Sequence, residues 1–149
     1  MKNNVLCDTI QRIWFLSATE AGSVHDKKVA DEYPLHLPQG SVLGQDTGFL
    51  GYEPAGVLIE MPYKTPRRGE LSFTQRLYNR MVSSERVVVE HANSGIKRLR
   101  MVKDMIRLHG WWLRDTVLGV ACGLHNLRVM SPHRGYLAQA CVIEQNKFQ

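Results

Sequence analysis

The chain has 149 residues, of which 44% are hydrophobic and 22% are charged. This composition is typical of one globular domain with a buried core and argues against a disordered protein. No apolar run approaches the roughly 20 residues that a membrane-spanning helix needs, and the first residues predict a strand rather than a signal peptide. The three cysteines are widely spaced. They argue for reduced thiols in a cytoplasmic protein and against a zinc site or a disulfide framework.

The net charge of +5 is distributed unevenly along the chain. Between Lys64 and Arg114 there are twelve basic and four acidic side chains, a local balance of +8, whereas the rest of the chain carries −3. A basic segment of this kind suits a polyanionic partner such as DNA. The same pattern is also typical of a solvated helix face, so charge alone leaves both interpretations open.

Four short runs rich in apolar, β-branched and aromatic residues predict strands, at residues 2–8, 12–18, 41–46 and 57–61. A short turn-like segment separates the first two runs, which therefore predict a β-hairpin. The third run ends at Asp46, and the glycines that follow fit a tight loop. From residue 131 onward the periodicity is weak, and the tail is expected to be loosely ordered.

Helices are predicted for residues 24–32, 70–103 and 114–129. Ser23 precedes the first of these, and Asp26 follows three residues later in the manner of a capping box. The second helix is predicted because it lacks proline and repeats apolar residues at helical spacing. Its expected apolar stripe consists of Leu77, Met81, Val88, Ala92 and Leu99.

Two acidic residues are the strongest candidates for a functional site. Asp46 lies at the tip of a predicted strand, and Glu90 lies on a predicted helix with three valines before it and Arg86 one turn earlier. A carboxylate from a strand end and a second from a later helix are a common means of holding Mg²⁺ against a phosphate. A lone glutamate on a helix is more often only solvated, so the spacing by itself leaves the role of Glu90 open.

Beyond Asp46 and Glu90, the chain contains several specific segments, at residues 22–28, 45–52, 66–71, 79–80, 86–91, 97–98 and 122–126. In this order, the segments resemble those of the DDE superfamily endonucleases, which are transposases of bacterial insertion sequences related to the Harbinger elements. The resemblance covers most of the chain, from about residue 2 to residue 128. It implies that Asp46 and Glu90 correspond to the second acidic residue and the final glutamate of the family motif.

This resemblance implies an α/β fold of the ribonuclease-H-like type, a mixed sheet of five strands with helices on both faces. Residues 1–130 are expected to be a partial catalytic domain, and residues 131–149 a tail. The family carries its first Asp on strand one, between strands two and four, and the chain starts after that point. We therefore expect the central strand to be missing, which leaves its two neighbours without a hydrogen-bonding partner. The chain is then the C-terminal part of a transposase.

The resemblance also implies the chemistry and the partners. Asp46 and Glu90 are expected to be catalytic ligands of Mg²⁺ or Mn²⁺ in metal-dependent DNA cleavage and strand transfer. The implied partner is DNA, as transposon ends and as target, in a bacterial cytoplasm at the nucleoid, and the intact enzyme is compatible with a homo-oligomer. Contacts to DNA phosphates are expected from Lys64, Arg67, Arg68, Arg86, Lys97 and Arg98.

Other interpretations remain. A catalytically inactive DNA-binding remnant keeps the basic face but lacks one carboxylate. Asp8 and Asp26 are weak substitutes for the missing Asp, because a turn and a helix start are ordinary places for aspartate. An α/β hydrolase is disfavoured because no Gly-x-Ser-x-Gly elbow occurs, and a zinc enzyme because the six histidines lack ligand spacing.

Overall fold

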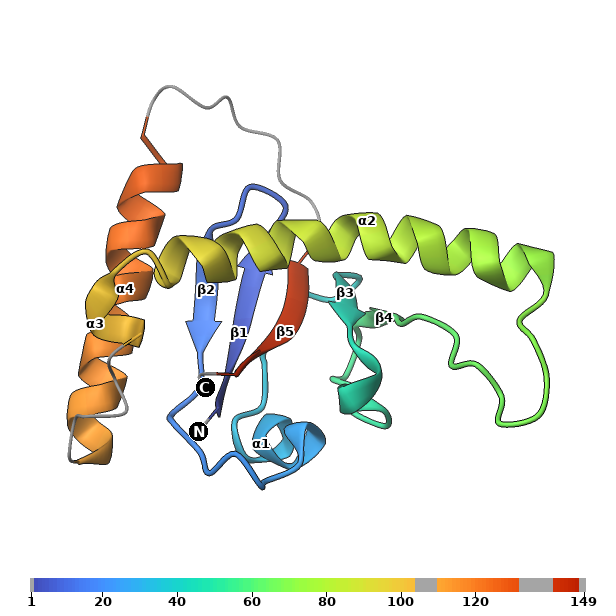
Figure 1. Cartoon of the computed structure of the whole chain (residues 1–149), viewed down its shortest axis with the longest axis horizontal. Coiled ribbons are helices and arrows are strands. Elements are labelled where there is room, and N and C mark those ends of the chain that lie inside the picture. Colours follow the sequence, from blue (N-terminus) through green and yellow to red (C-terminus); the bar gives the residue numbers. More distant parts are fainter. Residues whose placement is uncertain (1, 104–109, 132–140, 148–149) are drawn as a thin grey trace.

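A computed structural model describes residues 2–103, 110–131 and 141–147, the last segment by its backbone. These residues form a mixed α/β fold with a five-stranded sheet of order β2-β1-β5-β3-β4 (Figure 1). The strands are β1 (Lys2–Asp8), β2 (Ile13–Leu16), β3 (Val42–Gln45), β4 (Leu58–Glu60) and β5 (Cys141–Lys147). Among the described residues, no helix combines the length and the apolar character needed to cross a membrane.

The predicted hairpin is confirmed, and a single carboxylate organises its turn. Asp8 accepts hydrogen bonds from the backbone N–H groups of Ile10 (3.1 Å) and Arg12 (2.9 Å) through one oxygen. The other oxygen accepts a bond of 2.9 Å from Nε1 of Trp14. Asp8 is therefore fully used by the turn, as its position in the sequence suggested.

Helix α4 (Trp111–Val129) is fixed against this hairpin by two neighbouring polar side chains. Asn126 accepts from the N–H of Ile13 and donates to the carbonyl of the same residue, both at 2.8 Å. His125 is 3% exposed, and its Nε2 lies 2.8 Å from the carbonyl oxygen of Gln11. These contacts give a structural reason for His125 and Asn126, because the two side chains pair with backbone groups of the hairpin turn and of Ile13 at the start of β2.

Strand β5 corrects the expectation that the centre of the sheet is empty. It lies between β1 and β3, antiparallel to β1 over seven residue pairs and parallel to β3 over three. The weak periodicity after residue 131 did not predict this strand, because a central strand needs no alternation of polar and apolar residues. The boundary proposed at residue 130 stays a prediction, although β5 joins part of the expected tail to the sheet.

Helix α1 (Asp26–Glu32) begins later than the sequence pattern predicted. His25 stands at its N-cap without a side-chain cap, so the capping role predicted for Ser23 is wrong. Asp26 is not part of a capping box. Its carboxylate instead lies 2.7 Å from Nζ of Lys2, an ion pair whose side chains are only 19% and 6% exposed. The pair ties α1 to the start of β1.

The single helix predicted for residues 70–103 is two helices, α2 (Phe73–Ile96) and α3 (Arg100–Lys103). A capping box of Ser72 and Gln75 starts α2. At its end the chain tightens, because the N–H of Leu99 bonds the carbonyl of Ile96, three residues back. Leu99 packs on the core at this bend, which accounts for the interruption.

The apolar stripe predicted for α2 is also shifted. Leu77 is 53% and Met81 is 64% exposed, because the first half of α2 extends beyond the sheet (Figure 1). The buried face consists of Val82, Val89, Ala92 and Ile96, so Ala92 of the predicted stripe is buried as expected, and Leu99 packs against the core beyond the end of α2. The apolar periodicity predicted that this segment is a helix, but it did not predict which part of the helix packs on the sheet.

Two apolar clusters lie on opposite faces of the sheet, so helices cover both faces. On one face, Val5 and Cys7 of β1 pack with residues of α2, α3 and α4. On the other face, Leu6 and Leu43 pack with Ala30 of α1 and with Phe49 after β3. Alternate residues of β1 therefore enter different clusters, as the period of a strand requires.

We predict that removal of residues 141–149 destabilises the fold severely, because β1 and β3 then both lose a hydrogen-bonding neighbour. Thermal unfolding followed by circular dichroism should lose its cooperative transition, and the shortened chain should bind a hydrophobic dye. Removal of residues 148–149 alone is the matched control and should leave the transition in place. An unchanged melting temperature in the chain without β5 would contradict its role.

Candidate functional site

Asp46 lies where β3 ends, at the N-cap of the short helix η1 (Thr47–Phe49). One carboxylate oxygen accepts from the N–H of Thr47 at 2.8 Å, and the side chain is 39% exposed. The end of the strand thus holds a carboxylate that is oriented by the backbone and still open to solvent, as a ligand for a cation or a phosphate-bound metal must be.

A half-buried aspartate lies beside the segment that follows Asp46. A Cβ on Gly48 would lie 2.6 Å from Oδ2 of Asp26, so a larger residue at this position would have to displace the carboxylate. Asp26 forms its ion pair with Lys2 and lies beside Gly48, whereas the carboxylate of Asp8 accepts hydrogen bonds within the hairpin turn.

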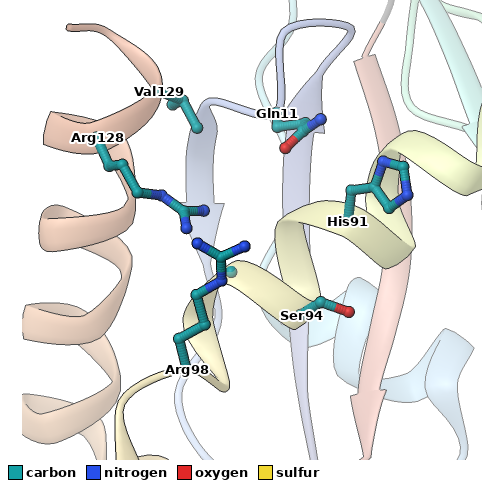
Figure 2. A pocket seen from close by; sticks show the side chains of 7 residues that line it. Gln11, His91, Ser94, Arg98, Arg128 and Val129 are labelled. Carbon is teal, nitrogen blue, oxygen red and sulfur yellow. The ribbon is translucent and has the colours of Figure 1, made fainter.

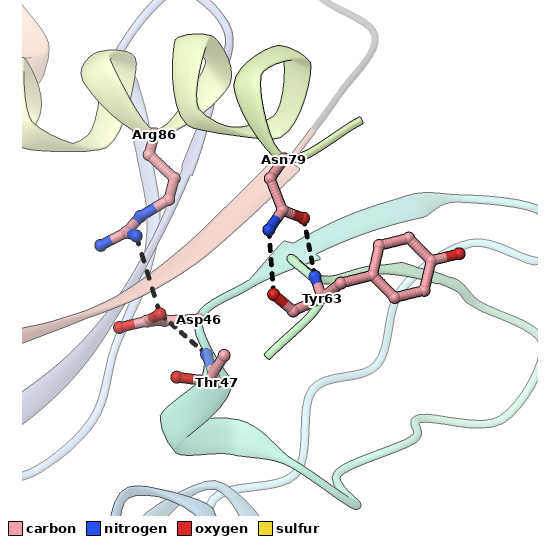
Figure 3. A network of polar contacts seen from close by, with 5 residues as sticks. All are labelled: Asp46, Thr47, Tyr63, Asn79 and Arg86. Carbon is pink, nitrogen blue, oxygen red and sulfur yellow. Dashed lines mark hydrogen bonds and ion pairs between the residues drawn. The ribbon is translucent and has the colours of Figure 1, made fainter. Parts of the chain in front are cut away.

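The middle of α2 faces Asp46. The Arg86 guanidinium lies 3.7 Å from Oδ1 of Asp46, across the gap between α2 and β3 (Figure 3). Glu90 follows Arg86 by one helical turn and is exposed, and residues at this spacing share one face of a helix. Asp46 therefore contacts α2 through Arg86. Glu90 is the acidic residue one turn further along the same face of α2.

Two further glutamates, which the sequence analysis did not single out, meet beside this region. Glu60 ends β4, and its backbone partner in β3 is Gly44, two residues before Asp46. Partial burial, the charge of Glu60 and a hydrogen bond between the two carboxyl groups raise the pKa of Glu85 on α2. Their separation of 25 residues in the sequence gave no signal of this contact.

The register of β5 places one more acidic residue near Asp46. Ile143 pairs with Gln45, the last residue of β3, so Glu144 and Asp46 each follow a paired residue along the chain. Glu144 is also the Cα partner of Val5 in β1.

The six basic residues predicted to contact DNA are spread along α2 and its preceding loop. Lys64, Arg67 and Arg68 are exposed in the loop between β4 and α2. Asn79 of α2 holds the start of this loop through bonds of 2.7 Å to the N–H of Tyr63 and 2.9 Å to its carbonyl (Figure 3).

Arg86 lies in the middle of α2, and Lys97 and Arg98 follow its last residue. With 24 residues, α2 is about 36 Å long. This length is close to one turn of B-form DNA. The basic groups therefore follow a line rather than form one cluster.

The donor atoms near Asp46 can be compared with the needs of a divalent metal. Within the described part of the chain, no group of three or more His, Cys, Asp or Glu side chains is arranged to hold an ion. Carboxylate oxygens such as those of Asp46 and Glu90 are the donors that Mg²⁺ and Mn²⁺ prefer, and Mg²⁺ is commonly held by one or two carboxylates together with substrate phosphates. The residues fit such an ion in chemical type.

Comparison with known proteins identifies the family. Residues 1–126 match the family model of the DDE superfamily endonucleases. The chain belongs to this family. It is also 28% identical over 86 residues to the probable transposase for insertion sequence element IS702 of Microchaete diplosiphon.

The match to this transposase covers 58% of the chain and 31% of the relative, so the chain aligns with less than a third of that protein. No solved structure matches the chain. The family predicted from the motifs is thereby confirmed. The region matched to the DDE endonucleases includes both Asp46 and Glu90.

We predict that Glu85→Gln raises the melting temperature by roughly 1–3 °C at pH 7, because it removes repulsion with Glu60. The pKa of Glu85 is raised on folding. The ionised carboxylate is thus disfavoured in the folded chain, and stability should increase as the pH falls through that raised pKa. The gain of the variant should therefore shrink in acid. Glu70→Gln, an exposed control, should show no such pH-dependent difference, and an equal effect of both substitutions would contradict the assignment.

Proposed function

We propose that the chain is a metal-binding and DNA-binding part of an insertion-sequence transposase, in which Asp46 and Glu90 are the catalytic carboxylates. The observation that carries the proposal is the meeting of Asp46 with α2 through Arg86 at 3.7 Å. It brings the strand end and the helix that the DDE motif requires to one place. The family match and the relative described as a probable transposase support the same function.

The proposed fold is ribonuclease-H-like. The order and directions of the strands support it, since β1 and β2 form the antiparallel side of the sheet and β3 and β4 the parallel side. In family terms these are strands two, three, four and five. Strand β5 takes the place of strand one, antiparallel to β1 and parallel to β3.

The carboxylates of Asp46 and Glu90 would hold the divalent metal, Mg²⁺ or Mn²⁺, as a hard ion with oxygen ligands. When bound, the metal would polarise the scissile phosphodiester and activate the attacking oxygen. Arg86 pairs with a DNA phosphate and helps to neutralise the charge that the two carboxylates and the phosphate bring together. Two carboxylates alone would hold such an ion weakly.

The basic loop and α2 lie along DNA and contact phosphates, which positions a duplex without specifying its sequence. Lys64, Arg67 and Arg68 contribute from the loop, and Arg86, Lys97 and Arg98 from α2 and its end. The length of α2, close to one turn of the duplex, supports this arrangement. The competing function is a DNA-binding remnant that cleaves nothing, and metal binding and cleavage separate the two.

We predict that Mn²⁺ binds the chain with a 1:1 stoichiometry and that Asp46→Asn and Glu90→Gln each weaken binding about tenfold or more, because each removes a charged ligand. Electron paramagnetic resonance of free Mn²⁺ measures this directly. Asp31→Asn, on the outer side of α1, is the matched control. Equal affinity of the Asp46 variant and the control would contradict the metal site.

In the same samples we expect negligible nicking of plasmid DNA with Mg²⁺ or Mn²⁺. Misplacement of a catalytic group by about 1 Å can lower the rate about a hundredfold. Strong cleavage that is lost in Asp46→Asn would overturn this expectation. Glu144, which the register of β5 places beside Asp46, would then be the next residue to substitute.

We also predict that DNA binding falls by about a thousandfold between 50 and 200 mM salt if the six basic side chains each contact a phosphate. Fluorescence anisotropy of a labelled duplex measures the slope, and Arg67→Gln combined with Arg68→Gln should reduce it by about two. Lys27→Gln combined with Lys28→Gln, on the opposite face in α1, serves as the control. Binding indifferent to salt would contradict a phosphate-tracking surface.

A further inference from the structure

We propose that a second site, between α2, α4 and the turn of the hairpin, binds a phosphate group. A hollow of about 380 Å³ opens there, away from Asp46. It is lined by Gln11, His91, Ser94, Gly95, Arg98, Arg128 and Val129. The volume accommodates a phosphate with some of its water, and the lining combines two guanidinium groups with smaller polar side chains.

The two arginines approach the same space from different helices. Arg98 comes from the end of α2 and Arg128 from the last turn of α4, and their guanidinium groups face each other across the hollow (Figure 2). Two like charges that converge on one volume repel each other, and an anion between them removes that repulsion. Guanidinium groups bind phosphate through paired N–H donors, which is the geometry that this arrangement offers.

A buried histidine positions one of these arginines. Nδ1 of His125 lies 3.2 Å from a guanidinium nitrogen of Arg128, and Nε2 of His125 lies 2.8 Å from the carbonyl of Gln11. If Nε2 carries the proton it donates to Gln11, and Nδ1 then accepts from Arg128. Burial, with the nearby charges of Arg128 and Arg98, lowers the pKa of His125, which favours this neutral form.

A glycine makes the close approach of α2 and α4 possible. A Cβ on Gly95 would overlap Nδ1 of His125 and would lie 2.7 Å from a guanidinium nitrogen of Arg128. Any other residue at position 95 must displace one or both side chains. The glycine thus allows Arg128 of α4 to lie against α2, where it lines the hollow.

The chemistry of the lining favours phosphate over a carboxylate ligand. Arg98 and Arg128 supply two sets of paired N–H donors from two helices, which suits a phosphate with several oxygens better than a carboxylate with two. The phosphate can belong to a nucleic-acid backbone or be free inorganic phosphate. The site shares only Arg98 with the DNA contacts proposed above, and neither Asp46 nor Glu90 is among the residues that line it.

The test measures binding of inorganic phosphate by calorimetry and of a labelled 20-base-pair duplex by anisotropy, both without divalent metal. Arg98→Gln and Arg128→Gln should each weaken binding about tenfold. Arg76→Gln, an exposed position on the distant half of α2, is the matched control and should change phosphate binding little. Gly95→Ala should weaken binding as Arg128→Gln does, without removing any charge.

Weaker binding of both probes assigns a backbone phosphate, and weaker binding of inorganic phosphate alone assigns a free anion. Binding of both probes by Arg128→Gln at the level of Arg76→Gln would overturn the proposal. Arg128→Lys, which keeps the charge but loses the paired donors, should lie between the two and covers the case in which Arg128→Gln fails to fold. Asp46→Asn should leave phosphate binding unchanged, so failure of the metal site and failure of this site are distinguishable.

Discussion

The hydrogen bonds made by the central strand hold the two halves of this fold together. The antiparallel pair β1–β2 and the parallel pair β3–β4 have no direct backbone bonds to each other in the sheet, and β5 pairs with both. Asp46 belongs to the parallel half, whereas much of the core beneath α2 belongs to β1. The position of Asp46 relative to α2 therefore depends on a strand that is nearly last in the sequence.

Helix α2 is the second element that joins the parts. Its first half holds the basic loop through Asn79, its middle reaches β3 through Arg86, and its end packs on α4 at Gly95. A rigid helix transmits position along its length, so the loop, the carboxylates and the phosphate hollow keep a fixed order. The apolar residues in the first half of α2 are exposed because that half extends beyond the sheet, whereas the second half packs on it (Figure 1).

Local patterns in the sequence predicted the elements, and long-range contacts limited what they could predict. The hairpin, the strand that ends at Asp46 and the helix of Glu90 all follow from apolar periodicity and turn residues. The sequence could not predict that β5 enters the sheet, because that pairing joins residues more than 130 positions apart. The exposure of Leu77 and Met81 was missed because periodicity contains no information about where the sheet ends.

The same limit applies to the site. The contexts of Asp46 and Glu90 were recognisable, because a strand tip and a helix face are local features. The contact of Glu60 with Glu85 and the support of Arg128 by His125 were not, because each joins elements whose packing no short pattern specifies. Asp26 also illustrates the difference. Its place at the start of a helix suggested a cap, but in the folded chain its carboxylate forms an ion pair with Lys2 and lies beside Gly48.

In the proposed site, Arg86 interacts with each of the other charged groups: the carboxylate of Asp46, a metal ion and a DNA phosphate. Beside Asp46 it stabilises the carboxylate, and it also opposes any second cation that approaches the same oxygen. A phosphodiester changes this balance, because its negative charge attracts both the guanidinium and a metal ion. Within the proposed function, metal and DNA should therefore strengthen each other's binding, and by thermodynamic linkage the two effects must be equal. In this arrangement, Arg86 favours metal binding when DNA is present, which is the condition under which a metal ion could contribute to cleavage.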